Sequence, residues 1–397
     1  MKIKIKCQPE DFIVEEKANL PRLEVGPFAV YKLKKRGWNT VDAIRQISRA
    51  WDLRYGDCAY GGKKDRWGLT TQWITIRGGR EKCLELKDIA LDFLGYTDRP
   101  MGPDAIEANL FKTVVRDLNE DQAGAARDAC DNVTRAGFVN YFDDQRFGGY
   151  DPKQGFLADR LLKGHFNGVL KAYLSSTHPE DKKEEKARKA FFDQHWKDWQ
   201  ACLGMAKTSF EKRVFARLVN DPRGMLSLIE DIPPEDLHMA ISAYQSFLWN
   251  EVVRRLLINR HWAQCVYDGV AGDYIFFEKL SPHDHEYLKD MTVVHPAAKA
   301  QMPDKIVGKI YEKVLTENEL QPNIFNKMKT RKVFFKPTPR KVLIKPKDVA
   351  VKIDADELYA GKRKVLLEFS LPRGSYATMF IKRIFARPFV VEDVRKA

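Results

Sequence analysis

Closely spaced cysteine pairs are missing from this sequence of 397 residues. The six cysteines lie far apart along the chain, at Cys7, Cys58, Cys83, Cys130, Cys202 and Cys265. Zinc ribbons and dithiol redox motifs need pairs of ligands a few residues apart. We therefore expect reduced, mostly buried thiols and no zinc ribbon or redox centre.

Other signatures of cofactor chemistry are also missing. The chain has no glycine-rich phosphate-binding loop and no nucleophile elbow, which excludes the usual nucleotide-dependent and hydrolase classes. The nearest approach to a metal cluster is His283, Asp284 and His285, which have no second ligand pair at a recognisable spacing. We predict a polar loop there, and neither a metal nor a cofactor for the protein.

Long apolar runs are absent as well. No run approaches the length that a membrane-spanning helix needs. The first six residues alternate lysine with apolar residues, as in a strand, and lack the apolar centre of a signal peptide. We therefore expect a soluble, cytoplasmic protein that contacts no membrane, and a monomer without a protein partner.

Positive charge is what the chain has in excess. Its 68 Lys and Arg against 55 Asp and Glu give a net charge of +13, which points to a polyanionic partner such as nucleic acid. Residues 327–347 contain nine Lys and Arg, no acidic residue, and the neighbours Phe334 and Phe335. Basic residues interleaved with aromatics suit RNA phosphates and bases, while a solvated linker is the alternative interpretation.

The first 150 residues mix strand and helix patterns. Residues 2–16, 31–33 and 110–118 read as strands, whereas Ala43, Ile44, Ile47 and Trp51 follow helical spacing after a cap at Asn39 or Thr40. Residues 120–136 are helical in pattern and end at Gly137. This mixture predicts an α+β sheet domain.

Beyond residue 150 the pattern changes to long helices. These are expected at residues 157–174, 182–197 and 237–258, and strands resume from Gly272. Residues 365–380 alternate again, with a turn at 372–375. If this last segment joins the first sheet, the helical part is an insertion into one sheet domain.

One carboxylate stands among cations in residues 62–72. Asp65 is flanked by Lys63, Lys64 and Arg66, and a strand-like segment follows it. Neighbouring cations lower the pKa of a carboxyl, which makes it a better nucleophile and a poorer acid. Taken alone, such a turn is more often solvated charge than a site.

Several separated segments together resemble the TruD family of tRNA pseudouridine synthases. They are residues 9–16 with 35–40, residues 62–72 around Asp65, residues 140–148, residues 371–378 and, more softly, residues 242–250. Their order and their wide spacing across nearly the whole chain make the match specific.

The resemblance implies a pseudouridine synthase mixed-sheet catalytic domain interrupted by a largely helical α/β TRUD insertion domain. The expected boundaries are residues 1–165 and 345–397 for the catalytic domain and 166–344 for the insertion, with a basic cleft for tRNA. The implied activity is isomerisation of a uridine in the D-stem region of tRNA, U13 in the bacterial members, to pseudouridine.

By the same resemblance Asp65 takes the place of the catalytic aspartate. Phe12, Asn140 and Tyr376 fall where the family contacts the target nucleotide, although relatives can carry Phe at the Tyr376 position. Supporting roles are expected for Lys64, Arg66, Gln145 and Arg146. The stretch at 164–234 is longer than in compact bacterial members, so its contacts do not carry over.

The reaction breaks a C–N glycosidic bond, turns the uracil and rejoins it through carbon, without redox partner, metal or nucleotide cofactor. Asp65 can add to the base or ribose, or take a proton from the sugar, after the base is flipped out. The alternative is a non-catalytic structured-RNA-binding protein of the same fold, which the intact Asp65 disfavours. A nuclease or deaminase would need metal ligands that the Cys and His spacings do not offer.

Overall fold

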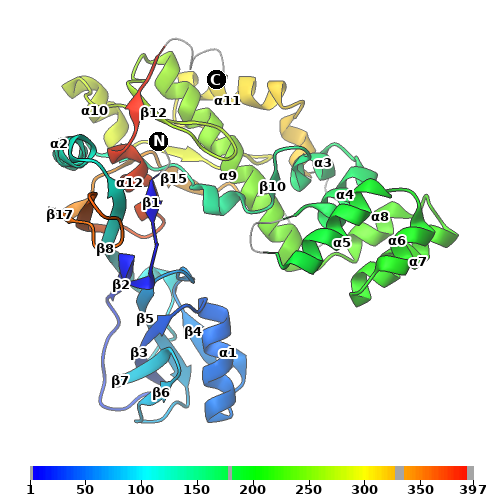
Figure 1. Ribbon diagram of the computed structural model, residues 1–397, viewed down its shortest axis with the longest axis horizontal. Coiled ribbons are helices and arrows are strands. Elements are labelled where there is room, and N and C mark those ends of the chain that lie inside the picture. The colour runs from blue at the N-terminus through cyan, green and yellow to red at the C-terminus, as the bar shows by residue number, and fades with distance from the viewer. Residues whose placement is uncertain (1–2, 178–180, 327–334, 391–397) are drawn as a thin grey trace. The chain divides into compact units, whose positions relative to one another are not determined.

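The chain folds into two compact units in the computed structural model, which describes residues 3–177, 181–326 and 335–390. The first unit comprises Met1–Asn140 and Leu343–Arg387, and the second comprises Tyr141–Val342 and Pro388–Ala397. The chain thus leaves the first unit, builds the second and returns (Figure 1). In the described ranges, no helix is long and apolar enough to span a bilayer.

A ten-stranded mixed sheet forms the first unit, in the order β17-β18-β8-β2-β5-β3-β7-β6, with β1 paired to β8 and β4 to β5. The β2–β5 pair is parallel and the other pairs are antiparallel. The strands are β1 (Lys4–Ile5), β2 (Phe12–Ala18), β3 (Phe28–Arg36), β4 (Cys58–Tyr60), β5 (Leu69–Arg77), β6 (Leu84–Leu86), β7 (Ile89–Thr97), β8 (Ile106–Leu118), β17 (Lys347–Ala355) and β18 (Arg363–Leu371). The returning strands therefore complete the sheet that the first strands began, as the sequence predicted.

Helices cover this sheet. The first unit also contains η1 (Pro9–Asp11), α1 (Thr40–Trp51), η2 (Tyr55–Asp57), η3 (Pro103–Ala105), α2 (Glu120–Ala136), β9 (Phe138–Val139), β16 (Leu343–Ile344) and α12 (Ala377–Ile384). The α1 helix begins where Asn39 accepts a hydrogen bond from the backbone N–H of Asp42, and its apolar face is buried with β3, β5 and β7. The α2 helix ends at Gly137, whose φ of 82° suits glycine. Both helices confirm the sequence prediction.

A buried arginine ties the start of β2 to the connection between β17 and β18. Arg116 on β8 is 2% exposed, and its guanidinium donates to both Asp11 oxygens at 2.7–3.0 Å and to Asp356 at 2.9 Å. Glu357 accepts a further bond at 3.0 Å. Because Asp11 immediately precedes Phe12, this network fixes the segment that leads into β2.

The second unit is mostly helical and is organised around one long helix, α9. Its elements are η4 (Asp144–Phe147), β10 (Tyr150–Asp151), β11 (Gly155–Phe156), α3 (Leu157–Leu162), α4 (Phe166–Ser175), α5 (Lys183–Gln194), α6 (Trp199–Met205), α7 (Ser209–Asn220), α8 (Met225–Glu230), α9 (Pro234–Asn259), β12 (Cys265–Tyr267), β13 (Tyr274–Phe276), α10 (Pro282–Lys289), β14 (Thr292–Val294), α11 (Lys305–Glu317), η5 (Pro322–Asn326) and β15 (Pro339–Lys341). The short β19 (Arg387–Pro388) lies at the last boundary between the units. Figure 1 shows α4 to α8 gathered into one helical group.

The first boundary between the units differs from the one expected at residue 165. Residues 141–165 belong to the second unit because their aromatic side chains pack on α9. The Phe142 ring lies 5.6 Å from that of Trp249, and the Phe156 ring lies 4.9 Å from that of Phe247. The return at residue 343 is close to the expected 345.

Two helix predictions need correction. Residues 157–174 form two helices, α3 and α4, because Gly164 adopts a φ of 74° and ends the first one. The alternation expected over residues 365–380 stops at Leu371, and α12 follows the turn. Ala377, Phe380 and Ile384 of α12 are buried at helical spacing, which is a signal that the sequence already contained.

Removing the buried guanidinium should unfold the first unit more easily. We expect Arg116→Ala to lower the free energy of unfolding by about 3–5 kcal/mol, because Asp11 and Asp356 stay buried without their counter-charge. Urea denaturation measures this change. Arg99→Ala, which breaks the exposed Arg99–Asp104 pair, should cost less than about 1 kcal/mol. Equal losses in both variants would contradict this account.

Candidate active site

Asp65 lies in the turn that joins β4 to β5. Gly68 brings this turn against the start of β2, since a Cβ on Gly68 would stand 2.3 Å from the backbone oxygen of Phe12. The parallel pairing of the two strands follows directly, with Ile13 opposite Leu69. The turn therefore places Asp65 where β2 begins.

The ion-pair partner of Asp65 is Lys6, which lies between β1 and η1. The Lys6 ammonium contacts one Asp65 carboxylate oxygen, and the other oxygen accepts the backbone N–H of Trp67 at 3.1 Å. Both charged side chains are partly exposed, Lys6 at 16% and Asp65 at 21%. Lys6 has a left-handed φ of 59°, which is uncommon for a residue other than glycine and is often found at functional sites.

Two opposing effects set the pKa of the Asp65 carboxyl. Burial acts to raise it, because desolvation disfavours the charged form. The Lys6 ammonium, the Trp67 N–H and the charge of Lys35 act to lower the pKa and together outweigh burial. Asp65 is therefore held as a carboxylate.

A second lysine holds the backbone of the same turn. Lys35 on β3 is 3% exposed, and its ammonium donates to the backbone oxygens of Trp38 at 2.6 Å, Asp65 at 2.8 Å and Lys64 at 3.4 Å. Burial lowers the pKa of Lys35 to about 8, with a partial offset from Asp65 and a further small lowering from Lys64. Lys35 thus fixes the backbone that carries the carboxylate.

Lys64 does not pair with Asp65 but turns toward the sheet. Its ammonium contacts Glu16 at 2.6 Å and the side-chain oxygen of Asn109 at 2.5 Å. Its backbone N–H donates to the Thr40 hydroxyl at 2.8 Å. Lys64 therefore anchors the turn to β2, β8 and α1, and its expected support of Asp65 is positional.

Arg66 also points away from the carboxylate. Its Nε donates to the backbone oxygen of Gly37 at 3.3 Å, and its guanidinium lies 5.1 Å from the ring centre of Trp67. Lys63 is exposed. Of the cations expected from the sequence to hold Asp65 ionised, Lys64 and Arg66 have other contacts, and Lys6 takes that place.

Phe12 lies directly beside this pair. Its side chain is 4% exposed, the Lys6 ammonium stands 4.3 Å from its ring centre, and Phe111 packs edge-on at 6.2 Å. The ring therefore forms part of the floor under Lys6. A nucleotide can reach it only when the Lys6 side chain moves.

Asn140 and Tyr376 belong to the same unit as Asp65. Asn140 follows β9 and is 4% exposed, whereas Tyr376 is half-buried and caps the N-terminus of α12. The strand before Tyr376 ends at Leu371, opposite the Asn109 that holds Lys64. The sheet thus links the Tyr376 turn to the Asp65 turn through β18, β8 and Lys64.

Gln145 and Arg146 lie in the second unit, on η4. The Arg146 Nε donates to the Ser246 hydroxyl at 3.3 Å, and its guanidinium lies 5.9 Å from the ring centre of Phe142. Both side chains are exposed. Gln145 and Arg146 therefore stand apart from the Lys6, Lys35 and Lys64 contacts that surround Asp65.

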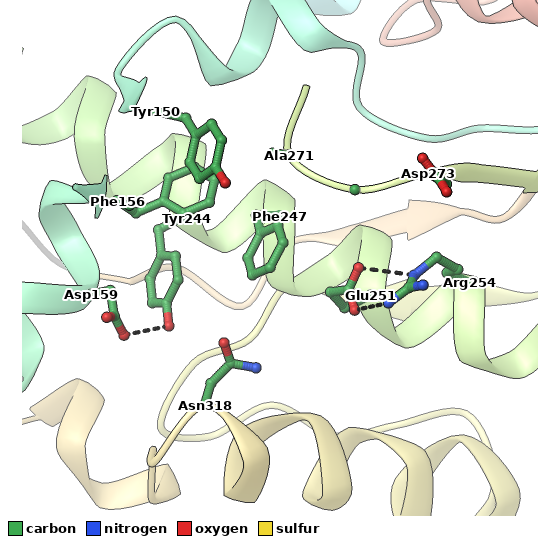
Figure 2. Close-up of a pocket in the computed structure, with 12 residues that line it drawn as sticks. Tyr150, Phe156, Asp159, Tyr244, Phe247, Glu251, Arg254, Ala271, Asp273 and Asn318 are labelled. Carbon is green, nitrogen blue, oxygen red and sulfur yellow. Dashed lines mark hydrogen bonds and ion pairs between the residues drawn. The ribbon is translucent and has the colours of Figure 1, made fainter. Parts of the chain in front are cut away.

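A cavity of about 560 Å³ also lies in the second unit, beside α9. Figure 2 shows aromatic rings along one side of it and charged groups along the other. Tyr244 donates to Asp159 at 2.7 Å, and Arg254 Nε donates to Glu251 at 3.0 Å. With Asp273 also lining it, three carboxylates face one guanidinium, so the cavity does not favour an anion.

The histidine pair considered as a metal cluster sits at the start of α10. His283 is 87% exposed, and Asp284 accepts a hydrogen bond from Ser281 at 2.7 Å. Within the three described ranges, no group of three His, Cys, Asp or Glu side chains converges as a metal site.

Two site residues were missed from the sequence, Lys6 and Lys35. Lys35 had a signal, because it continues the inward alternation of Tyr31 and Leu33, both of which are fully buried. A lysine at an inward strand position marks a buried cation with a specific partner. Lys6 had none, since its contact with Asp65 joins residues 59 positions apart.

Comparisons with known proteins agree with this geometry. The family model of tRNA pseudouridine synthase D (TruD) matches residues 1–384. The tRNA pseudouridine synthase D of Leptospira interrogans is 30% identical over 96% of both chains, and the probable tRNA pseudouridine synthase D 1 of Methanococcus maripaludis is 31% identical over 96% of this chain and 99% of its own. A crystal structure from Methanosarcina mazei that carries the TruD name matches with a TM-score of 0.72 and 26% identity, over 96% of this chain and 93% of the other. The chain therefore belongs to the TruD family of tRNA pseudouridine synthases.

Proposed function

We propose that this pseudouridine synthase isomerises uridine 13, in the D-stem region of tRNA, and that Asp65 is its catalytic carboxylate. The observation that carries the proposal is the ion pair of Asp65 with Lys6 at the start of β2. The first unit then serves as the catalytic domain, and the second as the insertion. We also expect a monomer in the cytoplasm, as the sequence suggested.

The chemistry needs an ionised carboxylate at the reacting sugar. Asp65 can add to the ribose or the base, or remove a proton from the sugar, and each route uses the unprotonated oxygen. Lys6 keeps that oxygen unprotonated beside a polyanionic substrate, whose phosphates would otherwise raise the pKa of Asp65. The exposed part of the carboxylate leaves room for the ribose.

The target uridine has to leave its stack to reach Asp65. Base flipping costs a few kcal/mol, and stacking on an aromatic ring offsets about 1–3 kcal/mol of it. Tyr376 is the half-buried ring that can provide this surface, and Asn140 provides an amide for a uracil edge or sugar hydroxyl. Phe12 joins them once Lys6 shifts from its ring toward the substrate.

The substrate backbone requires cations beyond the reaction centre. The described end of the basic segment carries Lys336, Arg340, Lys341, Lys345 and Lys347. Phosphate contacts from such residues position RNA without reading its sequence. The first part of that segment, at 327–334, lies outside the described residues, so its proposed phosphate contacts rest on the sequence alone.

Replacing the carboxylate should separate catalysis from binding. We expect Asp65→Asn to reduce pseudouridine formation in tRNA by at least about 10³-fold, because the amide cannot act as nucleophile or base. Salt-dependent tRNA binding should persist, since phosphate contacts dominate affinity. Asp92→Asn, at an exposed pair with Lys34 in the same unit, serves as the matched control and should keep activity. Undiminished product from Asp65→Asn would overturn the assignment and favour a binding role for this turn.

Removing the ammonium should change how activity depends on pH. In Lys6→Met the burial of Asp65 is no longer opposed by its ion-pair partner, so the pKa of the carboxyl rises. The acid limb of the kcat/KM profile then moves to higher pH, and activity falls most below neutrality. The control Lys63→Met, at an exposed neighbouring position, should leave the acid limb in place. Coincident acid limbs for Lys6→Met and the original enzyme would remove Lys6 from this role.

The position of modification is a separate expectation. Pseudouridine mapping of cellular RNA with and without the protein should show loss of the modification at uridine 13 of tRNA. Loss at another uridine instead would leave the chemistry in place and refute the position.

A further inference from the structure

Gln145 and Arg146 lie outside the Asp65 network, yet both line a cavity of about 660 Å³ in the second unit. Its walls come from η4, α4, α5, α7 and α9. Because both side chains are exposed, they stand at the rim of the cavity. The volume is typical of pockets that take small organic ligands.

The interior of this cavity is apolar and aromatic. The Tyr173 and Phe210 rings meet edge-on at 5.4 Å, and Leu174 and Ala240 line the same space. Met239 also lines it and is 65% exposed, which is unusual for so large an apolar side chain. A planar ring could pack against this wall.

The charged groups in the wall are paired with one another. Arg188 contacts Glu211 at 3.0 Å, and Lys189 contacts Glu185 at 2.9 Å. Asp236 accepts the hydroxyl of Tyr173 at 2.6 Å. These pairs leave the wall close to neutral.

Arg146 differs from these groups. Its contacts in the described part of the chain are a hydroxyl, that of Ser246, and an aromatic ring, that of Phe142. A guanidinium without a carboxylate at the rim of an apolar pocket is suited to a phosphate, and the neighbouring Gln145 amide offers both donors and an acceptor.

We propose that this cavity binds one nucleotide of the RNA substrate, with its phosphate on Arg146 and its base against Tyr173, Phe210 and Met239. Every lining residue belongs to the second unit, so this nucleotide is not the uridine that reacts at Asp65. The cavity in Figure 2 does not compete for this role, because carboxylates outnumber cations in its lining. The inference rests on the proposed function only in naming RNA as the source of the nucleotide.

Free nucleotides test the cavity without any turnover. With 13C-methyl methionine in the full-length protein, adenosine and uridine monophosphates should shift the Met239 methyl signal, which Met239→Leu identifies. The parent nucleosides should bind about 10- to 100-fold more weakly, because they lack the charge-assisted contact to Arg146. Arg146→Ala should abolish this preference for the phosphate. Arg217→Ala, an exposed arginine on α7 that does not line the cavity, should retain it.

Transfer RNA then tests the source of the nucleotide. It should shift the same methyl signal, and Ala240→Phe, which fills the cavity, should raise KM for tRNA by about 10-fold with kcat retained. No shift with nucleotides at millimolar concentration, or an intact phosphate preference in Arg146→Ala, would overturn the site. Shifts with nucleotides but none with tRNA would overturn the RNA assignment in favour of a free nucleotide. Neither result touches the proposed function, which fails only through the Asp65 variants or the mapping.

Discussion

The ion pair between Lys6 and Asp65 is the interaction on which the candidate active site depends. It joins the first residues of the chain to the turn before β5, and it decides the protonation state of the carboxylate. Its geometry is supported from behind, since Asp11 a few residues later is locked to the buried Arg116. A surface pair with the same chemistry would contribute little, but here a fixed segment delivers the ammonium to a partly buried oxygen.

Three lysines around one turn have three different partners, and the differences explain the division of labour. Lys6 pairs with the Asp65 carboxylate, Lys35 with backbone carbonyls, and Lys64 with Glu16 and Asn109. Only the first acts directly on the ionisation of Asp65 through a hydrogen bond, while the other two hold the backbone still. A positioned carboxylate needs both, because catalysis depends on where the oxygen stands as much as on its charge.

Local patterns predicted much of the fold. Helices α1 and α2 follow from caps and periodicity, and the return of β18 to the first sheet follows from alternation. Contacts between residues distant in the sequence could not be derived in this way. The sequence suggested that Lys64 and Arg66 would hold Asp65 ionised because they are adjacent to it, whereas the structure gives that place to Lys6. The boundary near residue 140 was missed because the aromatic contacts of Phe142 and Phe156 with α9 have no local pattern.

The central claim is that Asp65 is held as a carboxylate by its surroundings. The most direct measurement is a pH titration of the 13C signal of its side-chain carboxyl, assigned by its disappearance in Asp65→Asn. The account predicts that the signal remains that of the ionised form through the neutral and mildly acidic range, with a pKa below the ordinary value of 3.8. A carboxyl that takes up its proton above that value would show that burial outweighs the Lys6 ammonium, and would contradict the account.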